Sequence, residues 1–173
     1  MVSEASTTNV GDGPAPPPPF DHRRAILGFM AVVVLAKVVY ALTAARGPVF
    51  GDGLELVAAA VCDGVPHPTG YPTLMMILGM VEQRAGAYAT ATTICGSLVA
   101  LAAGYIALTT SYWCYSLSRV ASGRWLAWLP VFAGLMAAFS AGLWNHATCV
   151  ETYSLQVLLV AVFVSLARPW YST

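Results

Sequence analysis

Long apolar runs separated by short polar breaks make up most of this chain. Ala25 to Ala45 and Thr90 to Cys114 each exceed the about 20 residues that span the hydrocarbon core of a bilayer. Two further runs, Leu126 to Trp144 and about Thr152 to Ala167, follow, and the polar link Asn145 to Glu151 separates them. The pattern predicts an all-α membrane protein with four transmembrane helices.

Polar segments flank and interrupt these runs. Residues 1–24 carry a run of prolines and few apolar side chains, which predicts a disordered cytoplasmic tail before a membrane domain of residues 25–168. The first apolar run is too long for a cleaved signal peptide, so we expect it to remain as the first span. Within the loop of residues 46–89, Tyr71 to Glu82 is apolar but short, which favours an interfacial helix. Residues 169–173 form the expected cytoplasmic end.

Arginines near the span ends favour this four-span topology, because positive residues concentrate on the cytoplasmic side. If Tyr71 to Glu82 stays at the surface, five arginines lie inside and two outside, whereas a crossing gives three inside and four outside. The five inside are Arg23, Arg24, Arg119, Arg124 and Arg168, and the two outside are Arg46 and Arg84. The same topology gathers six aromatic residues at one interface: Tyr112, Trp113, Tyr115, Trp125, Trp128 and Trp170. It also places the first loop and the link Asn145 to Glu151 together on the non-cytoplasmic side.

Composition narrows the class of protein. Of the 173 residues, 58% are hydrophobic and 9% are charged, whereas a soluble domain is about 25% charged. This excludes an ordinary soluble enzyme, and because eight basic residues only balance eight acidic ones, no nucleic acid partner is expected. Inside the first span, Lys37 must snorkel to the surface or find a polar partner. Gly96, Ala100 and Gly104 form a stripe of small residues that lets another helix pack closely.

Asp52 and Glu55 are the first candidates for chemistry. They stand three residues apart at the start of an apolar helical run, so both can face the same way. Asp52 then suits a general base. The same spacing is typical of a capping box, in which Asp52 caps the helix and Glu55 reaches back to it. The two roles do not exclude each other.

Two histidine-bearing segments add polar groups on the same side. His67 lies in a loop stiffened by three prolines and a glycine, although a lone loop histidine more often has no function. His146 and Glu151 lie between the third and fourth spans, where the helix dipole alone also favours an acidic residue. No spacing of these groups matches a metal motif, so no metal is expected. Cys62 and Cys149 share this side, and a disulfide between them is a further hypothesis.

Two motifs of the chain resemble a known family. Phe50 to Ala60, followed by Gly64 to Pro72, is similar to the first-loop hallmark of the transmembrane protein 260 family, also known as DUF2723. Its pattern runs approximately Asp-Ser-Gly-Glu-Leu and then Gly-Val-Ala-His-Pro-Pro-Gly-Tyr-Pro, and Gly53-Leu54 replaces Ser-Gly here. Phe-Ser, Trp and Glu-x-Tyr-Ser-Leu elements between Ala138 and Leu155 form a second match. The resemblance covers about residues 25–168, the amino-terminal part of such a protein.

The resemblance implies an activity and a set of site residues. Members are similar to protein O-mannosyltransferases, glycosyltransferases of the C-type fold that take a sugar from a polyprenyl-phosphate carrier. An acidic residue of the first extracytoplasmic loop, here Asp52, is then the catalytic base, with Glu55 as the second catalytic residue. Substrate-binding roles are implied for His67, Tyr71, His146, Glu151 and Tyr153. The implied partners are membrane lipid, a lipid-linked mannose donor in place of a cofactor, and an acceptor protein with Ser or Thr hydroxyls.

The expected function is that of the amino-terminal part of a polyprenyl-phosphate-sugar-dependent glycosyltransferase, incomplete without additional membrane helices or subunits. Its location is the endoplasmic reticulum membrane if the source is eukaryotic and the plasma membrane if it is bacterial. Arg46, Arg84 and His67 are the candidates to contact the phosphate leaving group. The alternative is a non-enzymatic membrane subunit, or a degenerate family member, with a role in assembly. A transporter fragment is a third interpretation, which the scarcity of polar residues in the spans disfavours.

Overall fold

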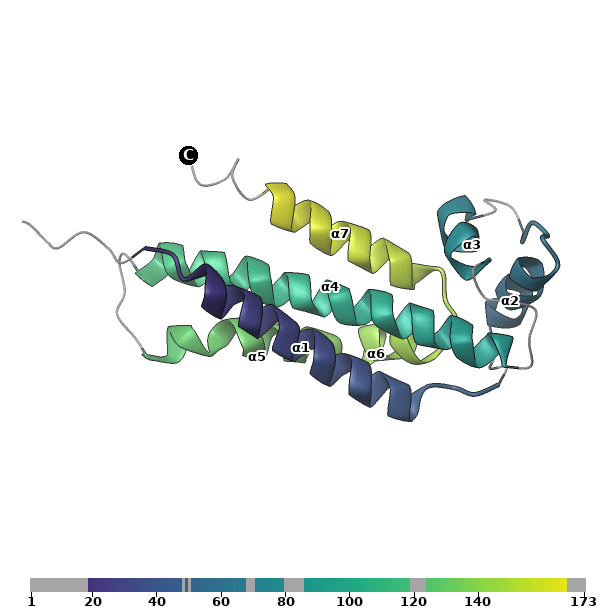
Figure 1. The fold of residues 1–173 in the computed structure, drawn as a ribbon, viewed down its shortest axis with the longest axis horizontal. Helices are drawn as coiled ribbons and strands as arrows, with labels where there is room; N and C mark the ends of the chain where they lie inside the picture. The colour runs from purple at the N-terminus through teal and green to yellow at the C-terminus, as the bar shows by residue number, and fades with distance from the viewer. Residues whose placement is uncertain are drawn as a thin grey trace, which may run out of the picture.

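Every regular element of the described chain is a helix. The computed structural model describes residues 19–47, 49, 51–67, 71–79, 86–118 and 124–167. Its elements are α1 (His22–Thr43), α2 (Gly53–Val61), α3 (Pro72–Leu78), α4 (Ala87–Ser118), the 3-10 helix η1 (Arg124–Ala127), α5 (Leu129–Ala138), α6 (Ala141–Thr148) and α7 (Tyr153–Ala167). Helices α1, α4, α5 and α7 run lengthwise beside one another, and α2 and α3 lie at one end (Figure 1). The all-helical class is confirmed.

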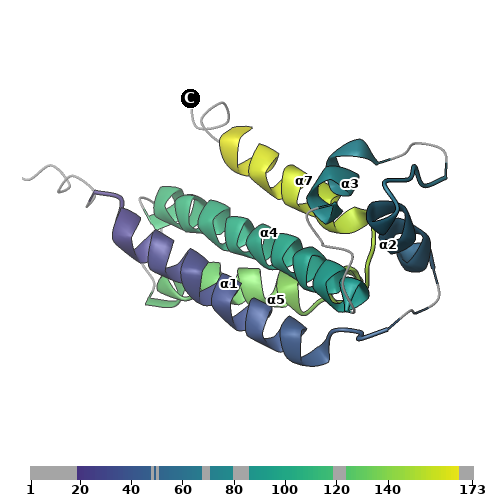
Figure 2. The ribbon, with the colours of Figure 1, turned by 45° about the vertical axis from the view of Figure 1, so that its right-hand side comes forward.

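Helix α4 is the centre of the bundle, with α1, the α5–α6 pair and α7 packed around it (Figure 2). Small residues let these helices approach. A Cβ on Gly96 would lie 2.9 Å from the carbonyl oxygen of Ala147, and one on Gly104 would lie 2.5 Å from Cγ2 of Val33. Ala100, between the two glycines, is fully buried. The predicted stripe of small residues is therefore confirmed as a packing surface for α1 and α6.

Among the described residues, two helices are long and apolar enough to cross a membrane, α1 with 22 residues and α4 with 32. Large apolar side chains of α1 also point outward along its length: Ile26, Leu27, Met30, Val34, Leu35, Val38 and Leu42. A helix that is apolar all round, with no protein against part of its surface, is typical of lipid contact. Because α5, α6 and α7 are each shorter than a single crossing, the third and fourth spans stay predictions.

The predicted third span is divided among η1, α5 and α6 rather than being one helix. The break falls at Ser140, whose backbone is extended at φ −64° and ψ 144°. Its hydroxyl donates to the carbonyl oxygen of Ala137 at 2.8 Å, and the hydroxyl of Tyr40 on α1 donates to that of Ala138 at 2.6 Å. These bonds satisfy carbonyl groups that the end of α5 would otherwise leave unpaired. The chain is then helical through Thr148, so the polar link is shorter than predicted.

The first loop and the link after α6 meet at one end of the bundle. The backbone N–H of Ala45 donates to the carbonyl oxygen of Thr148 at 2.8 Å. Gly53, the first residue of α2, lies so close to the link that a Cβ would approach the carbonyl oxygen of Val150 to 2.8 Å. Buried apolar side chains of α2, α3 and α4 complete this end: Leu56, Val57, Leu74, Leu78 and Tyr88. The loop and the link therefore share one end, and the membrane side that they face stays a prediction.

The start of α1 and the end of α4 meet at the opposite end. Phe20, before α1, stacks on Tyr112 of α4 with ring centroids 4.2 Å apart. Trp113, Trp125 and Trp128 are exposed on the last turns of α4 and around η1. Helix α1 begins at His22, earlier than predicted, where Asp21 caps it by accepting the N–H of Arg24. Several residues used in the predictions lie outside the described ones: Glu82, Arg84, Arg119, Arg168, Trp170 and the first 18 residues.

Candidate functional site

Asp52, Glu55 and His67 form a cluster beside the start of α2. The backbone N–H of His67 donates to Oε1 of Glu55 at 2.7 Å, and Nδ1 of its ring lies 3.1 Å from Oε2 of the same carboxylate. The other ring nitrogen, Nε2, lies 3.8 Å from Oδ2 of Asp52. The imidazole therefore stands between two carboxylates. All three side chains are partly exposed, 57% for Asp52, 48% for Glu55 and 36% for His67, so a substrate can reach them.

The capping-box interpretation of this pair is wrong. Asp52 occupies the N-cap position of α2, but its side chain makes no capping hydrogen bond, and both oxygens of Glu55 are bound to His67. The hydrogen bond from the backbone N–H of His67, and after it the bond from the ring, holds the pKa of Glu55 below its ordinary value of 4.5. Glu55 is thus ionised and engaged at neutral pH, whereas Asp52 is the more exposed of the two carboxylates and makes no capping bond.

Tyr71 lies on another side of His67. The two ring centroids are 5.7 Å apart and the rings are nearly perpendicular, at 76°. The backbone of Tyr71 is left-handed, with φ 41° and ψ 53°, and Pro72 follows it at the start of α3. This conformation is uncommon for a residue with a Cβ, and such strain is concentrated at functional sites. Here it accompanies the placement of the tyrosine ring against the histidine.

The link after α6 brings Glu151 to the same cluster. A Cβ on Gly51 would lie 3.5 Å from Oε1 of Glu151, so this carboxylate lies beside the residue that precedes Asp52. Gly51 has φ 120°, a conformation that glycine adopts without strain. On the other side of Asp52, Gly53 packs against the backbone of Val150. The glycine that stands where the family pattern has serine is therefore a packing requirement in this chain.

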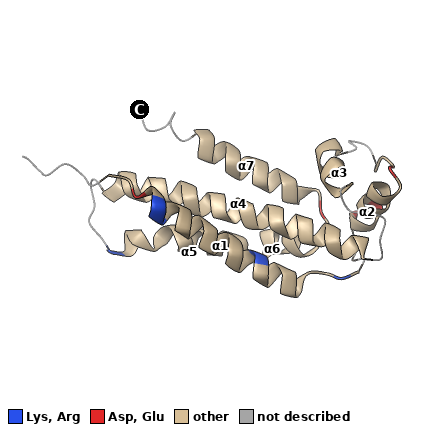
Figure 3. Cartoon of the chain, in the orientation of Figure 1, with Lys and Arg blue, Asp and Glu red and all other residues tan. Residues whose placement is uncertain are grey.

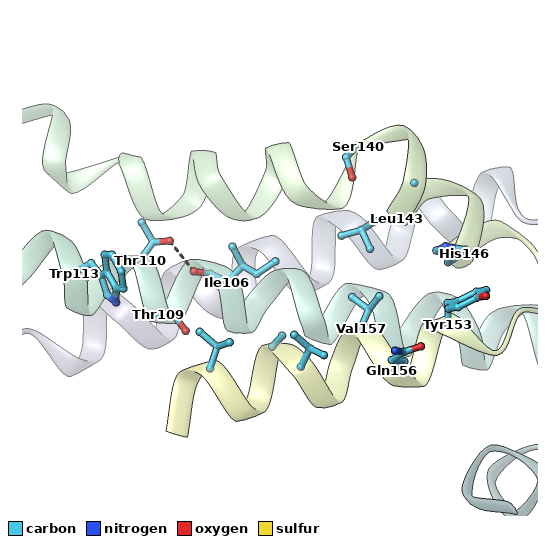
Figure 4. Close-up of a pocket in the computed structure, with 14 residues that line it drawn as sticks. Ile106, Thr109, Thr110, Trp113, Ser140, Leu143, His146, Tyr153, Gln156 and Val157 are labelled. Carbon is cyan, nitrogen blue, oxygen red and sulfur yellow. Dashed lines mark hydrogen bonds between the residues drawn. The ribbon is translucent and has the colours of Figure 1, made fainter. Parts of the chain in front are cut away.

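His146 and Tyr153 form a second group. His146 is in the last turn of α6 and Tyr153 begins α7, and their ring centroids are 5.1 Å apart. Both rings line an apolar groove of about 790 Å³ among α4, α6 and α7 (Figure 4). Most of the other lining is aliphatic: Ile106, Leu143, Val157, Val160, Ala161 and Val164. Within the described part of the chain, the buried Nδ1 of His146 has no hydrogen-bond partner.

A smaller pocket of about 300 Å³ is lined by Tyr71, which contacts His67, and by Tyr153, which contacts His146. Residues of α3 and α7 complete its lining. Gln156 lines this pocket and the larger groove as well. The sequence reasoning missed Gln156, although an amide within the apolar run Thr152 to Ala167 is a signal that could have found it. It also missed Val150, which acts through its backbone and gives no such signal.

The cysteines and the acidic and histidine side chains are the candidates for a disulfide and for a metal site. The four cysteines are free thiols, with Cys62 exposed, Cys149 half-buried, and Cys95 and Cys114 buried, so the structure contains no disulfide between Cys62 and Cys149. Across the described ranges, no group of three or more His, Cys, Asp or Glu side chains is arranged to hold a metal ion.

The fold and the site together define an all-helical protein with two described helices long and apolar enough to cross a membrane, and with polar side chains gathered in its first loop. Residues 52–173 match the family described as the protein O-mannosyl-transferase TMEM260 N-terminal domain, and the chain belongs to this family, as the first-loop motif predicted. It is 33% identical over 145 residues to mouse protein O-mannosyl-transferase TMEM260, an alignment that covers 82% of this chain. The same alignment covers 19% of the mouse protein, so the chain spans about a fifth of that relative. No solved structure matches the chain.

Proposed function

We propose that this chain carries the catalytic loop of a glycosyltransferase that moves mannose from a polyprenyl-phosphate carrier to Ser or Thr hydroxyls of proteins. The mouse relative is a protein O-mannosyl-transferase, which supports this class of reaction. The observation that carries the proposal is the position of His67 between the carboxylates of Asp52 and Glu55. In this proposal the loop faces the lumen of the endoplasmic reticulum or the outside of a bacterial cell, and further membrane helices complete the enzyme.

Asp52 is the general base of the proposed reaction. Its carboxylate takes the proton of the acceptor hydroxyl while the oxygen attacks C1 of the sugar. The bond between C1 and the phosphate oxygen breaks, and its electron pair leaves with the phosphate. Because C1 gains positive charge in such a transition state, the nearby carboxylates of Glu55 and Glu151 stabilise it. Removing a positioned acid or base typically costs roughly 10²–10⁴-fold in rate.

Glu55 and His67 position this base. Glu55 holds His67 through both the backbone N–H and Nδ1, which keeps Nε2 directed at Asp52. The ring nitrogens of His67 thus face one carboxylate each. The ring is also one candidate to donate a hydrogen bond to the departing phosphate. Arg46, which is exposed on the loop at this end of the bundle, is another.

The groove beside His146 and Tyr153 suits the hydrocarbon chain of the lipid carrier. Its aliphatic walls accept an apolar chain, and the polar groups of Tyr153 and Gln156 lie where the groove meets the smaller pocket. A carrier in this position directs its sugar toward Tyr71, which borders that pocket and contacts His67. Substrate-binding roles for Tyr71, His146 and Tyr153 follow from this path.

The test measures transfer of mannose from polyprenyl-phosphate mannose to a Ser/Thr peptide by membranes that contain the full-length protein. We expect Asp52→Asn to reduce transfer roughly 10²–10⁴-fold and Glu55→Gln to reduce it less. Asp63→Asn is the matched control, because Asp63 is exposed on the same loop and takes no part in the described ion pairs. Transfer at the wild-type rate by Asp52→Asn, with protein of equal abundance, refutes Asp52 as the base.

A further inference from the structure

The chain contains a single lysine, Lys37, and the proposed function gives it no role. It lies on α1, and its ammonium donates to the carbonyl oxygen of Thr93 at 2.6 Å and to the hydroxyl of Ser97 at 2.5 Å, both on α4. The Ser97 hydroxyl in turn donates to the carbonyl oxygen of Thr93 at 2.7 Å. The side chain therefore reaches across to a neighbouring helix instead of snorkelling along its own.

The ammonium lies inside a membrane-length helix. Lys37 precedes the end of α1 at Thr43 by six residues, which is about 9 Å along the helix axis. Its acceptors lie at least as deep, since Thr93 is six residues and Ser97 ten residues inside α4. Exposed apolar side chains of α1 surround it, with Met30, Val34 and Val38 each about half exposed. This surface of α1 faces lipid or another membrane helix.

The partners of Lys37 within the described chain are all neutral. No carboxylate lies within 4.0 Å of its ammonium in that part of the chain. The described acidic residues lie at the ends of the bundle (Figure 3), and neither α1 nor α4 contains an acidic residue. An ammonium has three N–H donors, and two are used here. A buried or membrane-embedded cation is stabilised when an anion completes its hydrogen bonding.

We propose that Lys37 pairs with a carboxylate on a further membrane helix that packs along the seam between α1 and α4. The seam offers polar and apolar contacts, because Thr93 is exposed on α4 where Lys37 reaches it, and Val34 and Val38, near Lys37 on α1, are half exposed. The depth of Lys37 favours a helix-borne carboxylate over a lipid phosphate, which lies at the level of the headgroups. The helix comes from the same polypeptide or from a second protein. A large part of the mouse relative lies outside the 19% that aligns.

A hydrophobic carbodiimide tests this pairing in native membranes. The reagent activates a carboxylate, the lysine nitrogen then forms an amide with its carbonyl carbon, and the carboxylate oxygen leaves within the urea product. Because Lys37 is the only lysine in these 173 residues, peptide mass spectrometry identifies its partner directly. Lys37→Arg is the matched control, since arginine keeps the positive charge and does not form the amide. Lys37→Met removes the charge as well.

We expect one amide that joins Lys37 to an Asp or Glu within an apolar, span-length segment, and its complete loss in Lys37→Arg and Lys37→Met. A product with the mass of one polypeptide less one water assigns the helix to the same protein, and a product with the combined mass of two polypeptides less one water assigns it to a second one. An amide to Glu82 or to any other acid of residues 1–173 overturns the proposal. So does a lack of Lys37 amide while membrane carboxylates are modified, and so does lipid phosphate that copurifies with wild type and Lys37→Arg but not with Lys37→Met.

Discussion

Single backbone positions fix the geometry of the candidate site. Asp52 stands between two glycines, Gly51 with φ 120° and Gly53 against the carbonyl oxygen of Val150. His67 then links the two carboxylates through its ring and its backbone N–H. None of these contacts depends on a large buried surface. Amino-acid substitutions that add or exchange only one or two atoms are therefore expected to change them.

Gly53→Ala is expected to destabilise the protein, because the new Cβ would lie 2.8 Å from a backbone oxygen that cannot rotate away. Overpacking of this kind costs about 1–3 kcal/mol. Gly142→Ala is the matched control: nothing lies within 4 Å of that Cβ, and the residue is in helix α6. Thermal unfolding in detergent measures both. Equal midpoints for the two variants would contradict the close approach of α2 to the link.

Glu55 is expected to titrate below its ordinary pKa of 4.5, because His67 hydrogen-bonds to its ionised form. Since the pKa of Glu55 in the folded protein lies below its pKa in the unfolded chain, the interaction stabilises the loop fully at pH values above the unfolded pKa. This stabilisation is lost as the pH falls through the lowered pKa of the folded protein. A 13C NMR titration of labelled Glu carboxyl groups measures this, with Glu55→Gln to assign the signal. His67→Ala should raise the pKa only in part, since the backbone N–H, the largest cause, remains.

At the scale of the elements, α4 holds the molecule together because small residues on its faces admit three neighbours. The break between α5 and α6 also helps to hold the elements together. It places Thr148 within hydrogen-bonding distance of Ala45 and begins a link that carries Glu151 to the first loop. If Leu126 to Trp144 formed one straight helix, the chain would not bend at Ser140, and the link that follows would not be directed toward the first loop.

Gly96→Ala and Gly104→Ala should each lower the unfolding midpoint, because their Cβ atoms would lie 2.9 Å and 2.5 Å from atoms of α6 and α1. About 1–3 kcal/mol per substitution is expected. Gly28→Ala on α1 is the control, because its Cβ would meet Cγ2 of Val131 at an acceptable 3.4 Å. If all three variants unfold at the wild-type midpoint in detergent, the helices are farther apart than described.

At the scale of the whole molecule, the bundle gathers its acidic loop, His67, His146 and its link at one end and its exposed tryptophans at the other. Such an arrangement suits a bilayer, because charged side chains are unfavourable in its hydrocarbon interior. The proposed reaction then takes place at one membrane surface, with the lipid carrier entering from the side through the groove among α4, α6 and α7.

Cysteine labelling tests this polarity. A membrane-impermeant maleimide added to vesicles with the non-cytoplasmic face outward should label the exposed Cys62, and Cys95 and Cys114 should stay protected because they are buried. In a Cys62→Ser background, Ser118→Cys at the exposed end of α4 should react only after permeabilisation. Labelling of Ser118→Cys on intact vesicles would place both ends of α4 on one side and contradict the topology.

The sequence by itself determined the helical class, the long helices α1 and α4, the stripe of small residues on α4, and the family. These depend on local composition, spacing and motif, which a chain carries without its fold. The positions of Asp52, Glu55 and His67 on one loop were also visible, because all three fall within the polar break of residues 46–89 between the first two long apolar runs.

Only the tertiary structure decided which of these residues meet and how. It turned a presumed capping box into a carboxylate pair bridged by His67, divided one predicted span at Ser140, and gave Lys37 its partners on α4. Each outcome depends on contacts between residues distant in the sequence, such as Gly53 with Val150 and Tyr40 with Ala138. Hydrophobic periodicity reports which face of a helix is buried, but not which atoms of another helix it will meet, because packing depends on shape in three dimensions.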